Sequence, residues 1–144
     1  LVGKGMAGYS LATGVSEDQK KFVEQLLTAT GKSLLIPEEL QNAITGTSGS
    51  GPAYFFRFVE AMIDGAVALG LSRADATTLT VQTIVGSAAM LEETGDSPTL
   101  LREKVTSLKG ATAEALGAFD EAGISKIVAD AMAASAKRAA ELAQ

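Results

Sequence analysis

The sequence contains neither cysteine nor histidine in its 144 residues. Without cysteine the chain has no disulfide framework and no thiolate nucleophile. Because histidine is missing too, the usual ligands of transition metals and the imidazole that acts as a general base near neutral pH are both absent. Any chemistry must therefore rely on hydroxyls, carboxylates, amines or backbone amides, and we expect no metal in the protein.

The sequence also has few positively charged residues and no long apolar segment. Lysine and arginine total 12 against 17 aspartates and glutamates, so the formal net charge is -5, and a nucleic-acid backbone is not an expected partner. No apolar run approaches the roughly 20 residues that a membrane-spanning helix needs, and no signal peptide is recognisable. Hydrophobic residues still make up 47% of the chain, so we expect a globular, cytoplasmic protein with a buried core.

Residues 1–36 have the pattern of one strand–helix–strand unit. MAGYSLA at 6–12 is compatible with a short strand, and SLLI at 33–36 with a second. Between them, Ser16 and Gln19 form a capping box that opens a helix with one apolar face. A single unit of this kind cannot cover its own sheet. We therefore expect this segment to be the end of a larger α/β domain.

Residues 37–144 predict helices throughout. Prolines and capping residues begin these helices, with a capping box at Ser72 and Asp75 and with either Asp96 or Ser97 before Pro98, and glycines end them. We expect helices over 52–70, 73–94, 98–104, 113–122 and 124–142, with SGSG before Pro52 as a loop. The predicted fold class is therefore mainly α, with an all-helical domain over 37–144 after the short βαβ unit.

Two stretches of these helices are too apolar for a small monomer. Residues 61–71 carry one charge, Asp64, and residues 79–91 carry none. A helix that is apolar nearly all round must be covered on every side, and small residues such as Gly65 and Gly86 allow close approach between helices. A second copy of the chain is the expected cover, although one central helix of a single bundle would account for one of the two stretches.

Two further features have ordinary structural explanations. SGSGPAY at 48–54 lacks the lysine of a P-loop and the glycine spacing of a dinucleotide fold, so a close connection between helices is the simpler interpretation. Glu60 and Asp64 lie four residues apart on one helix face and would suit acid–base chemistry. Such acidic residues more often form a solvated stripe or pair with a neighbouring arginine, which is the interpretation we adopt.

VTSLKGAT at 105–112 is the better candidate for a site. If Thr112 is the N-cap of the next helix, the free amides of that helix's first turn favour a carboxylate or phosphate. Gly110 lets a ligand approach the backbone closely, and Lys104 and Lys109 add positive charge. Plain N-capping by Thr112 is the simpler interpretation from the residues alone, and the anion site stays an alternative.

Taken together, three blocks of the sequence resemble pyrroline-5-carboxylate reductases in collinear order. They are SGSGPAYFFRFVEAMIDGAVALGLSRADA, QTIVGSAAMLEETGDSP and VTSLKGATAEALGAFDEAG. The third block resembles the signature of that family, a Thr-Ser pair followed by Gly-x-Thr before a helix. The chain departs from the signature at Leu108, where a proline is common, and at Lys109, where a small residue or asparagine is usual.

The resemblance implies an oxidoreductase that reduces 1-pyrroline-5-carboxylate to L-proline with NADPH or NADH, the last step of proline biosynthesis. It also implies a helical domain that forms a homodimer, and in many relatives a ring of dimers. Residues 1–36 would then be the C-terminal remnant of a Rossmann domain, whose earlier, coenzyme-binding part has no counterpart in this chain. Because the sequence begins at Leu1 without methionine, we expect a fragment or processed chain that is inactive alone.

By the same resemblance, the amides around Gly110, Ala111 and Thr112 hold the substrate carboxylate, with Ser107 nearby. The Thr112 hydroxyl is placed to hydrogen-bond the ring nitrogen as that nitrogen becomes an amine, which makes Thr112 the expected catalytic residue.

Two more positions are carried over from the family. Glu38 matches a position near the substrate, and Lys104 matches one near the cofactor. The alternative function for the chain is a non-catalytic helical oligomerisation module that binds small carboxylates.

Overall fold

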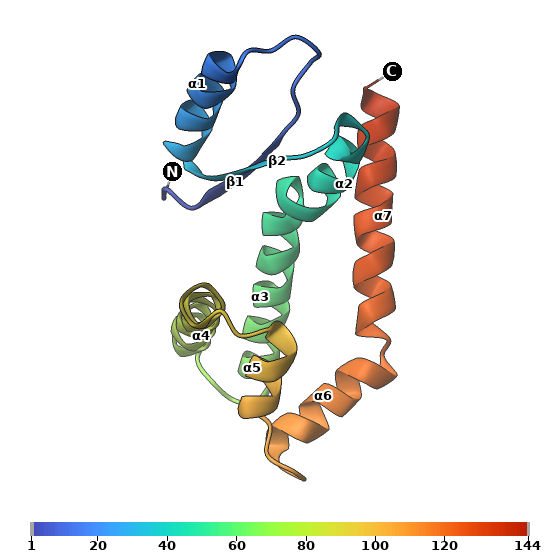
Figure 1. Ribbon diagram of the computed structural model, residues 1–144. Coiled ribbons are helices and arrows are strands. Elements are labelled where there is room, and N and C mark those ends of the chain that lie inside the picture. The colour runs from blue at the N-terminus through green and yellow to red at the C-terminus, as the bar shows by residue number, and fades with distance from the viewer. Residues whose placement is uncertain (1, 144) are drawn as a thin grey trace. The chain divides into compact units, whose positions relative to one another are not determined.

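The structure, a computed structural model, describes residues 2–143. Two strands and a helix form its N-terminal part, and the rest is helical (Figure 1). The mainly α fold and the βαβ unit predicted from the sequence are therefore confirmed. In chain order the elements are β1 (Gly5–Tyr9), α1 (Glu17–Thr28), β2 (Gly31–Leu35), the 3-10 helix η1 (Glu38–Leu40), α2 (Gln41–Ile44), the π-helix η2 (Thr45–Gly49), α3 (Gly51–Ala68), α4 (Arg73–Thr94), α5 (Pro98–Lys104), α6 (Ala111–Glu121) and α7 (Ile124–Leu142).

Contacts within the chain divide these elements into two compact units. The first comprises the residues up to Pro52 together with those from Val128 onward, and the second comprises Ala53–Ile127. α3 and α7 therefore each contribute residues to both units. The boundary predicted from the sequence, between residues 36 and 37, separates the α/β remnant from the helical domain and stays a prediction.

The first unit contains the parallel βαβ arrangement. β1 and β2 pair in register from Gly5 opposite Gly31 to Tyr9 opposite Leu35, and α1 connects the two strands (Figure 1). The Tyr9 hydroxyl donates a hydrogen bond to Glu24 Oε1 at 2.5 Å. This bond joins the end of β1 to the middle of α1, so the small sheet and its helix are fixed to each other by a side chain as well as by the connecting loops.

Short side-chain caps begin the helices where the sequence places them. In α1, Ser16 Oγ accepts from the Gln19 amide at 3.3 Å, and Gln19 Oε1 accepts from the Ser16 amide at 2.9 Å. Ser72 accepts from the Asp75 amide at 3.1 Å at the start of α4, and Ser97 caps α5 in the same manner. The predicted capping residues of α1, α4 and α5 are thus confirmed, because a cap is decided by residues within one turn.

The SGSG segment is not the loop that the sequence predicted. It forms the end of η2 and runs on into α3, with the Ser50 amide donating to the Thr45 carbonyl, five residues back, at 2.8 Å. Gly46 of η2 lies against α7, because a β-carbon built on it would lie 2.9 Å from the Met132 carbonyl oxygen. The Ser50 and Ser135 hydroxyls are hydrogen-bonded at 2.8 Å. This segment therefore allows close helix contact, and a π-helical turn provides the geometry.

The acidic residues Glu60 and Asp64 of α3 are paired with arginines, which is one of the two arrangements expected from the sequence. Arg57 Nη1 lies 3.3 Å from Glu60 Oε2, and Arg73 Nη2 lies 2.9 Å from Asp64 Oδ1. Both pairs are solvent-exposed, so each contributes little to stability. They account for the acidic residues of α3 without a catalytic role.

Few apolar side chains are buried within the chain. Among the described residues, Tyr9 and Ala76 are the buried apolar ones. The apolar side chains of α4 point to several sides of the helix, and Leu79, Val85 and Leu91 among them are 56%, 54% and 46% exposed. Such a helix needs further cover. Separately, no helix within residues 2–143 has the length and apolar character to cross a membrane, and the cytoplasmic location stays a prediction.

Candidate functional site

The loop between α5 and α6 is built around one tight turn. The Gly110 amide donates to the Ser107 carbonyl at 3.0 Å. Lys109 has a φ of 57°, whereas Leu108 does not have a positive φ. These are the features of a type II turn, which favours proline at its second position and glycine or asparagine at its third. Leu108 and Lys109 occupy those positions, so the turn gives a physical reason for the family preferences from which this chain departs.

Gly110 lies close to Ser107. A β-carbon built on Gly110 would overlap Ser107 Oγ, which is the end of a side chain that can rotate, and it would lie 3.1 Å from the Ser107 carbonyl oxygen. The glycine is also the N-cap of α6, with extended backbone angles and no side-chain cap. The prediction that Thr112 is the N-cap is therefore wrong. The turn at Ser107 brings the chain into the helix two residues earlier than the capping preference of threonine indicated.

Because the cap has no side chain, the first amides of α6 are left open. The Ala113 and Glu114 amides donate to the Gly110 carbonyl at 3.0 and 3.3 Å. No residue among 2–143 accepts from the amides of Ala111 and Thr112. These two N–H groups carry the partial positive charge of the helix N-terminus, where a carboxylate or phosphate binds favourably.

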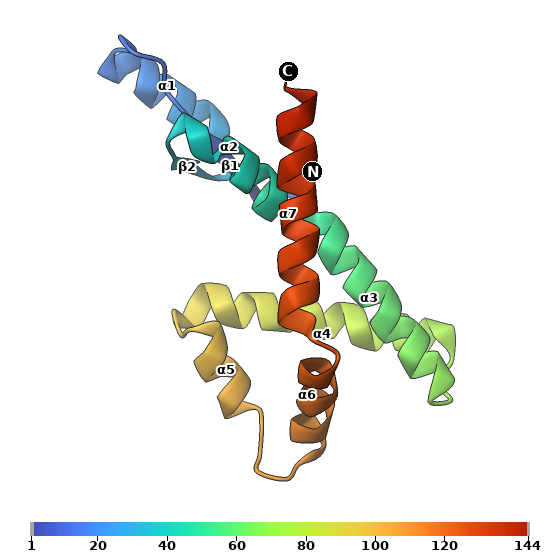
Figure 2. The same ribbon diagram turned by 90° about the vertical axis from the view of Figure 1, so that its right-hand side faces the viewer.

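The Thr112 hydroxyl also has no hydrogen-bond partner among residues 2–143. Other helical threonines, such as Thr77 and Thr83, donate to the carbonyl four residues earlier at 2.7 and 2.8 Å. Within the described part of the chain the Thr112 hydroxyl has no such bond, and its side chain is exposed. Thr112 therefore presents a hydroxyl beside two free amides. Ser107 and Gly110 lie in the loop between α5 and α6, which Figure 2 shows, and Ala111 and Thr112 form the first turn of α6 directly after it. Their role in binding a substrate stays a prediction.

The other two predicted site residues have different surroundings. Lys104 Nζ lies 2.5 Å from Asp96 Oδ2. The lysine at the end of α5 therefore forms an ion pair with the aspartate just before that helix. The sequence gave no reason to pair them, because they are eight residues apart and a helix lies between them. Glu38 begins η1 and is exposed. It belongs to the first compact unit whereas the loop belongs to the second, so Glu38 remains a prediction.

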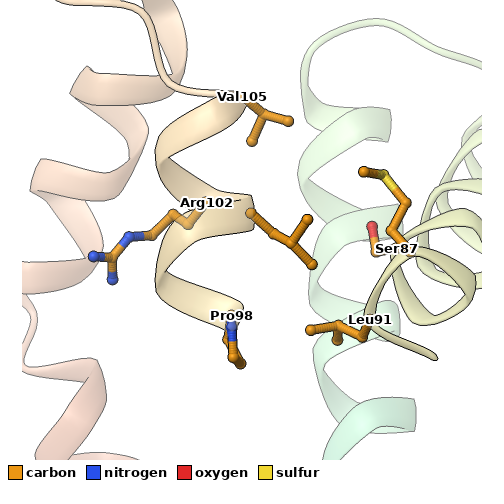
Figure 3. Close-up of a pocket in the computed structure, with 7 residues that line it drawn as sticks. Ser87, Leu91, Pro98, Arg102 and Val105 are labelled. Atoms are coloured by element: carbon orange, nitrogen blue, oxygen red, sulfur yellow. The ribbon is translucent and has the colours of Figure 1, made fainter. Parts of the chain in front are cut away.

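An apolar pocket lies directly before this loop and was not found from the sequence. It has a volume of about 310 Å³ between α4 and α5 and is lined by Ser87, Met90, Leu91, Pro98, Leu101, Arg102 and Val105. Figure 3 shows Leu91 facing α5, while the Arg102 guanidinium extends away from α4. Most of the pocket wall is apolar, and the Ser87 hydroxyl is its polar group. The pocket is therefore not suited to binding a charged ligand.

One stretch of the described residues has the glycine spacing of a dinucleotide fold. GKGMAG at 3–8 fits G-x-G-x-x-G, but it runs into β1 (Gly5–Tyr9) instead of lying between a strand and the start of a helix, where that motif holds a coenzyme pyrophosphate. No group of three or more acidic side chains within residues 2–143 is arranged to hold a metal ion.

The fold and the loop define the class of protein: a helical domain with incompletely covered helices and a loop that leaves two helix-start amides without a partner, joined to a parallel βαβ unit. A family model described as "Pyrroline-5-carboxylate reductase dimerisation" matches residues 38–142. The chain therefore belongs to the pyrroline-5-carboxylate reductase family, and residues 38–142 are its dimerisation domain.

Individual relatives agree with this assignment. A pyrroline-5-carboxylate reductase from Arabidopsis thaliana is 41% identical over 99% of this chain and 52% of its own length. The solved structure of the enzyme from Coxiella burnetii has a TM-score of 0.94 at 36% identity, covering 98% of this chain and 53% of that chain. That from Plasmodium falciparum, with NADP bound, has a TM-score of 0.88 at 31% identity over 95% of this chain and 52% of that chain. The chain spans about half the length of the curated relatives it matches.

Proposed function

We propose that this chain provides the dimer interface and the substrate-carboxylate loop of an enzyme that reduces 1-pyrroline-5-carboxylate to L-proline. This reaction is the last step of proline biosynthesis. The observation that carries the proposal is the start of α6, where two unpaired amides and the Thr112 hydroxyl face outward behind a glycine cap. Membership of the family supplies the substrate, because the relatives that the chain matches are named pyrroline-5-carboxylate reductase.

Each residue of the loop has a separate role in binding the substrate. The Ala111 and Thr112 amides donate hydrogen bonds to the ring carboxylate at the positive end of α6. Gly110 adds no side chain in front of these amides, so the start of the helix stays open to a ligand. A β-carbon at this position would also be crowded by Ser107. The Thr112 hydroxyl donates to the ring nitrogen or accepts from it as the nitrogen gains a proton. The protein thus fixes the carboxylate and orients the ring, which is how it accelerates the reaction.

The reductant is proposed to be NADPH or NADH, held mainly by residues outside this chain. When bound, the reduced nicotinamide supplies the hydride for the imine carbon. The relative from Plasmodium falciparum was solved with NADP bound. Lys104 remains a proposal for a contact near the cofactor, and it would first have to separate from Asp96.

The proposed assembly is a homodimer in which second-copy helices cover the exposed apolar side chains of α3 and α4. Phe55, Phe56, Leu79 and Val85 are each more than half exposed in the single chain. Assembly of the dimers into a ring is a further proposal that rests on the family alone.

The decisive experiment compares hydroxyl variants in the full-length gene product. We expect Thr112→Val, which keeps the shape of the side chain and removes the hydroxyl, to lower kcat by about 10- to 1000-fold. Thr112→Ser, which keeps the hydroxyl, should stay close to the parent. The measurement is the oxidation of NADPH or NADH in the presence of pyrroline-5-carboxylate. An unchanged rate for Thr112→Val would remove Thr112 from the mechanism.

The same assay tests the alternative of a non-catalytic oligomerisation module. If the full-length gene product binds small carboxylates and oxidises no coenzyme with pyrroline-5-carboxylate, the reductase proposal is wrong and the module remains. We also expect the 144-residue chain to be inactive alone, so turnover by that chain would contradict our placement of the coenzyme site.

A further inference from the structure

We propose that Lys109 is a specificity-determining residue of the substrate loop, where its ammonium group selects net-anionic ligands over zwitterionic ones. This inference rests on the proposed function and goes beyond it. Position 109 is one of the two at which the sequence departs from the family signature that it resembles.

The first step of the argument is the placement of Lys109. It is the one residue other than glycine with a positive φ among those that the structure describes. It lies at the third position of the turn that ends in Gly110, two residues before the first open amide at Ala111. A lysine in this backbone region is disfavoured by about 1–2 kcal/mol relative to glycine. The turn therefore places the backbone of Lys109 directly before the start of α6, within the length of a lysine side chain of the open amides.

The second step is the charge that surrounds the loop. Lys104, before the loop, is balanced by Asp96 at 2.5 Å. Lys109 is exposed, and within residues 2–143 it makes neither an ion pair nor a hydrogen bond. Glu114, the first acidic residue of α6, does not pair with it. Of the two lysines that flank the turn, Lys109 is thus the one whose charge is left for a ligand.

The third step is the charge of the ligands themselves. Pyrroline-5-carboxylate with a neutral imine nitrogen is a monoanion, whereas L-proline with a protonated amine is a zwitterion of zero net charge. A nearby ammonium attracts the monoanion, but it attracts the carboxylate and repels the amine of the zwitterion to similar extents. Lys109 should therefore tighten binding of the substrate more than binding of the product.

The size of the effect follows from Coulomb's law. At a separation of about 7 Å and an effective dielectric constant of about 40, one charge changes the affinity of a monoanion by about three- to tenfold. The same charge at a partly exposed site is screened by salt, so the effect should shrink as the Debye length falls from about 30 Å at 0.01 M to about 3 Å at 1 M salt.

The test uses the full-length gene product and two inhibitors of the same ring size. Cyclopentanecarboxylate is a monoanion without a ring nitrogen, and L-proline is the zwitterionic product. In Lys109→Asn, whose new residue tolerates positive φ, we expect the dissociation constant for cyclopentanecarboxylate to rise about three- to tenfold and that for L-proline to stay nearly unchanged. Calorimetry measures both constants, and the KM for pyrroline-5-carboxylate should follow the first.

Two further variants separate charge from backbone. Lys109→Arg keeps the charge and should retain the discrimination of the parent protein. Lys21→Asn removes an exposed lysine from α1, in the other compact unit, and should leave both constants unchanged. Equal effects on both ligands, or an effect that persists at 1 M salt, would overturn the role of Lys109.

The order of measurements keeps the two proposals apart. Turnover of pyrroline-5-carboxylate by the parent protein is measured first. Its absence would remove the proposed function, and this inference with it. Turnover accompanied by an unchanged ratio of the two dissociation constants in Lys109→Asn would remove this inference alone.

Discussion

At the scale of single residues, the contact between Tyr9 and Glu24 has a consequence for stability at high pH. The hydrogen bond to Glu24, burial and the negative charge of Glu24, in that order, raise the pKa of Tyr9 from 10.0 to about 12. The folded protein therefore keeps the tyrosine proton more tightly than the unfolded chain does. The resulting stabilisation is fully present below pH 10, and it is lost as pH rises through about 12.

We expect the urea midpoint of the protein to fall between pH 10 and pH 12 in part through Tyr9. In Glu24→Gln the fall should be smaller, because the strongest cause of the raised pKa is weakened. Tyr9→Phe should lack this component altogether, since nothing titrates at the position. A midpoint that falls equally in all three proteins would show that the Tyr9 contact does not contribute.

At the scale of elements, η2 and α7 depend on glycine where they meet. Gly46 has no room for a β-carbon, which would lie 2.9 Å from the Met132 carbonyl oxygen and 3.5 Å from Ala136 Cβ. The first distance involves a backbone atom, so relief would require the two helices to move apart. Ser50 and Ser135, hydrogen-bonded at 2.8 Å, would be separated by the same movement.

Gly46→Ala is accordingly expected to destabilise the protein by about 1–3 kcal/mol, as overpacking does. Gly117→Ala is the matched control, because Gly117 lies within α6 and its added β-carbon would meet nothing within 4 Å. That control should gain up to about 1 kcal/mol from helix propensity. Both values come from urea unfolding, and equal stability of the two variants would contradict the close contact between η2 and α7.

At the scale of the whole molecule, the exposed apolar residues of α4 require a partner. α4 carries Leu79, Val81, Val85, Met90 and Leu91 at exposures between 44% and 56%. These residues surround the helix, so no single covering element within one chain can bury all of them. A second copy of the same chain satisfies this requirement with a symmetric interface.

We expect Val85→Glu to shift the protein from dimer towards monomer by more than about tenfold in dissociation constant, because a charge would enter an apolar interface without a partner. Gln25→Glu adds the same charge at an exposed position of α1 and should leave the dimer intact. Light scattering over a range of concentrations distinguishes the two. A Val85→Glu protein that dimerises as well as Gln25→Glu would exclude α4 from the interface.

The sequence by itself determined the features that depend on neighbours along the chain. The capping residues Ser16, Ser72 and Ser97 were predictable because a cap is made within one helical turn. The arginine pairing of Glu60 and Asp64 was likewise expected from nearby residues. The loop at 105–112 was predicted to bind the substrate carboxylate only through the family resemblance, because plain capping by Thr112 was the simpler interpretation of the residues alone.

Only the tertiary structure decided the features that depend on distant atoms. SGSG became the end of a π-helix because Gly46 meets α7, which is remote in sequence. Lys104 forms an ion pair with Asp96, eight residues away, which leaves Lys109 as the lysine of the turn without such a pair among residues 2–143. The N-cap of α6 is a local exception, because the turn from Ser107 to Gly110 starts the helix two residues before the position that the capping preference of threonine, about 1 kcal/mol, indicated. The contacts of Gly46 and Lys104 needed the folded chain, because no local preference predicts which residues approach through space.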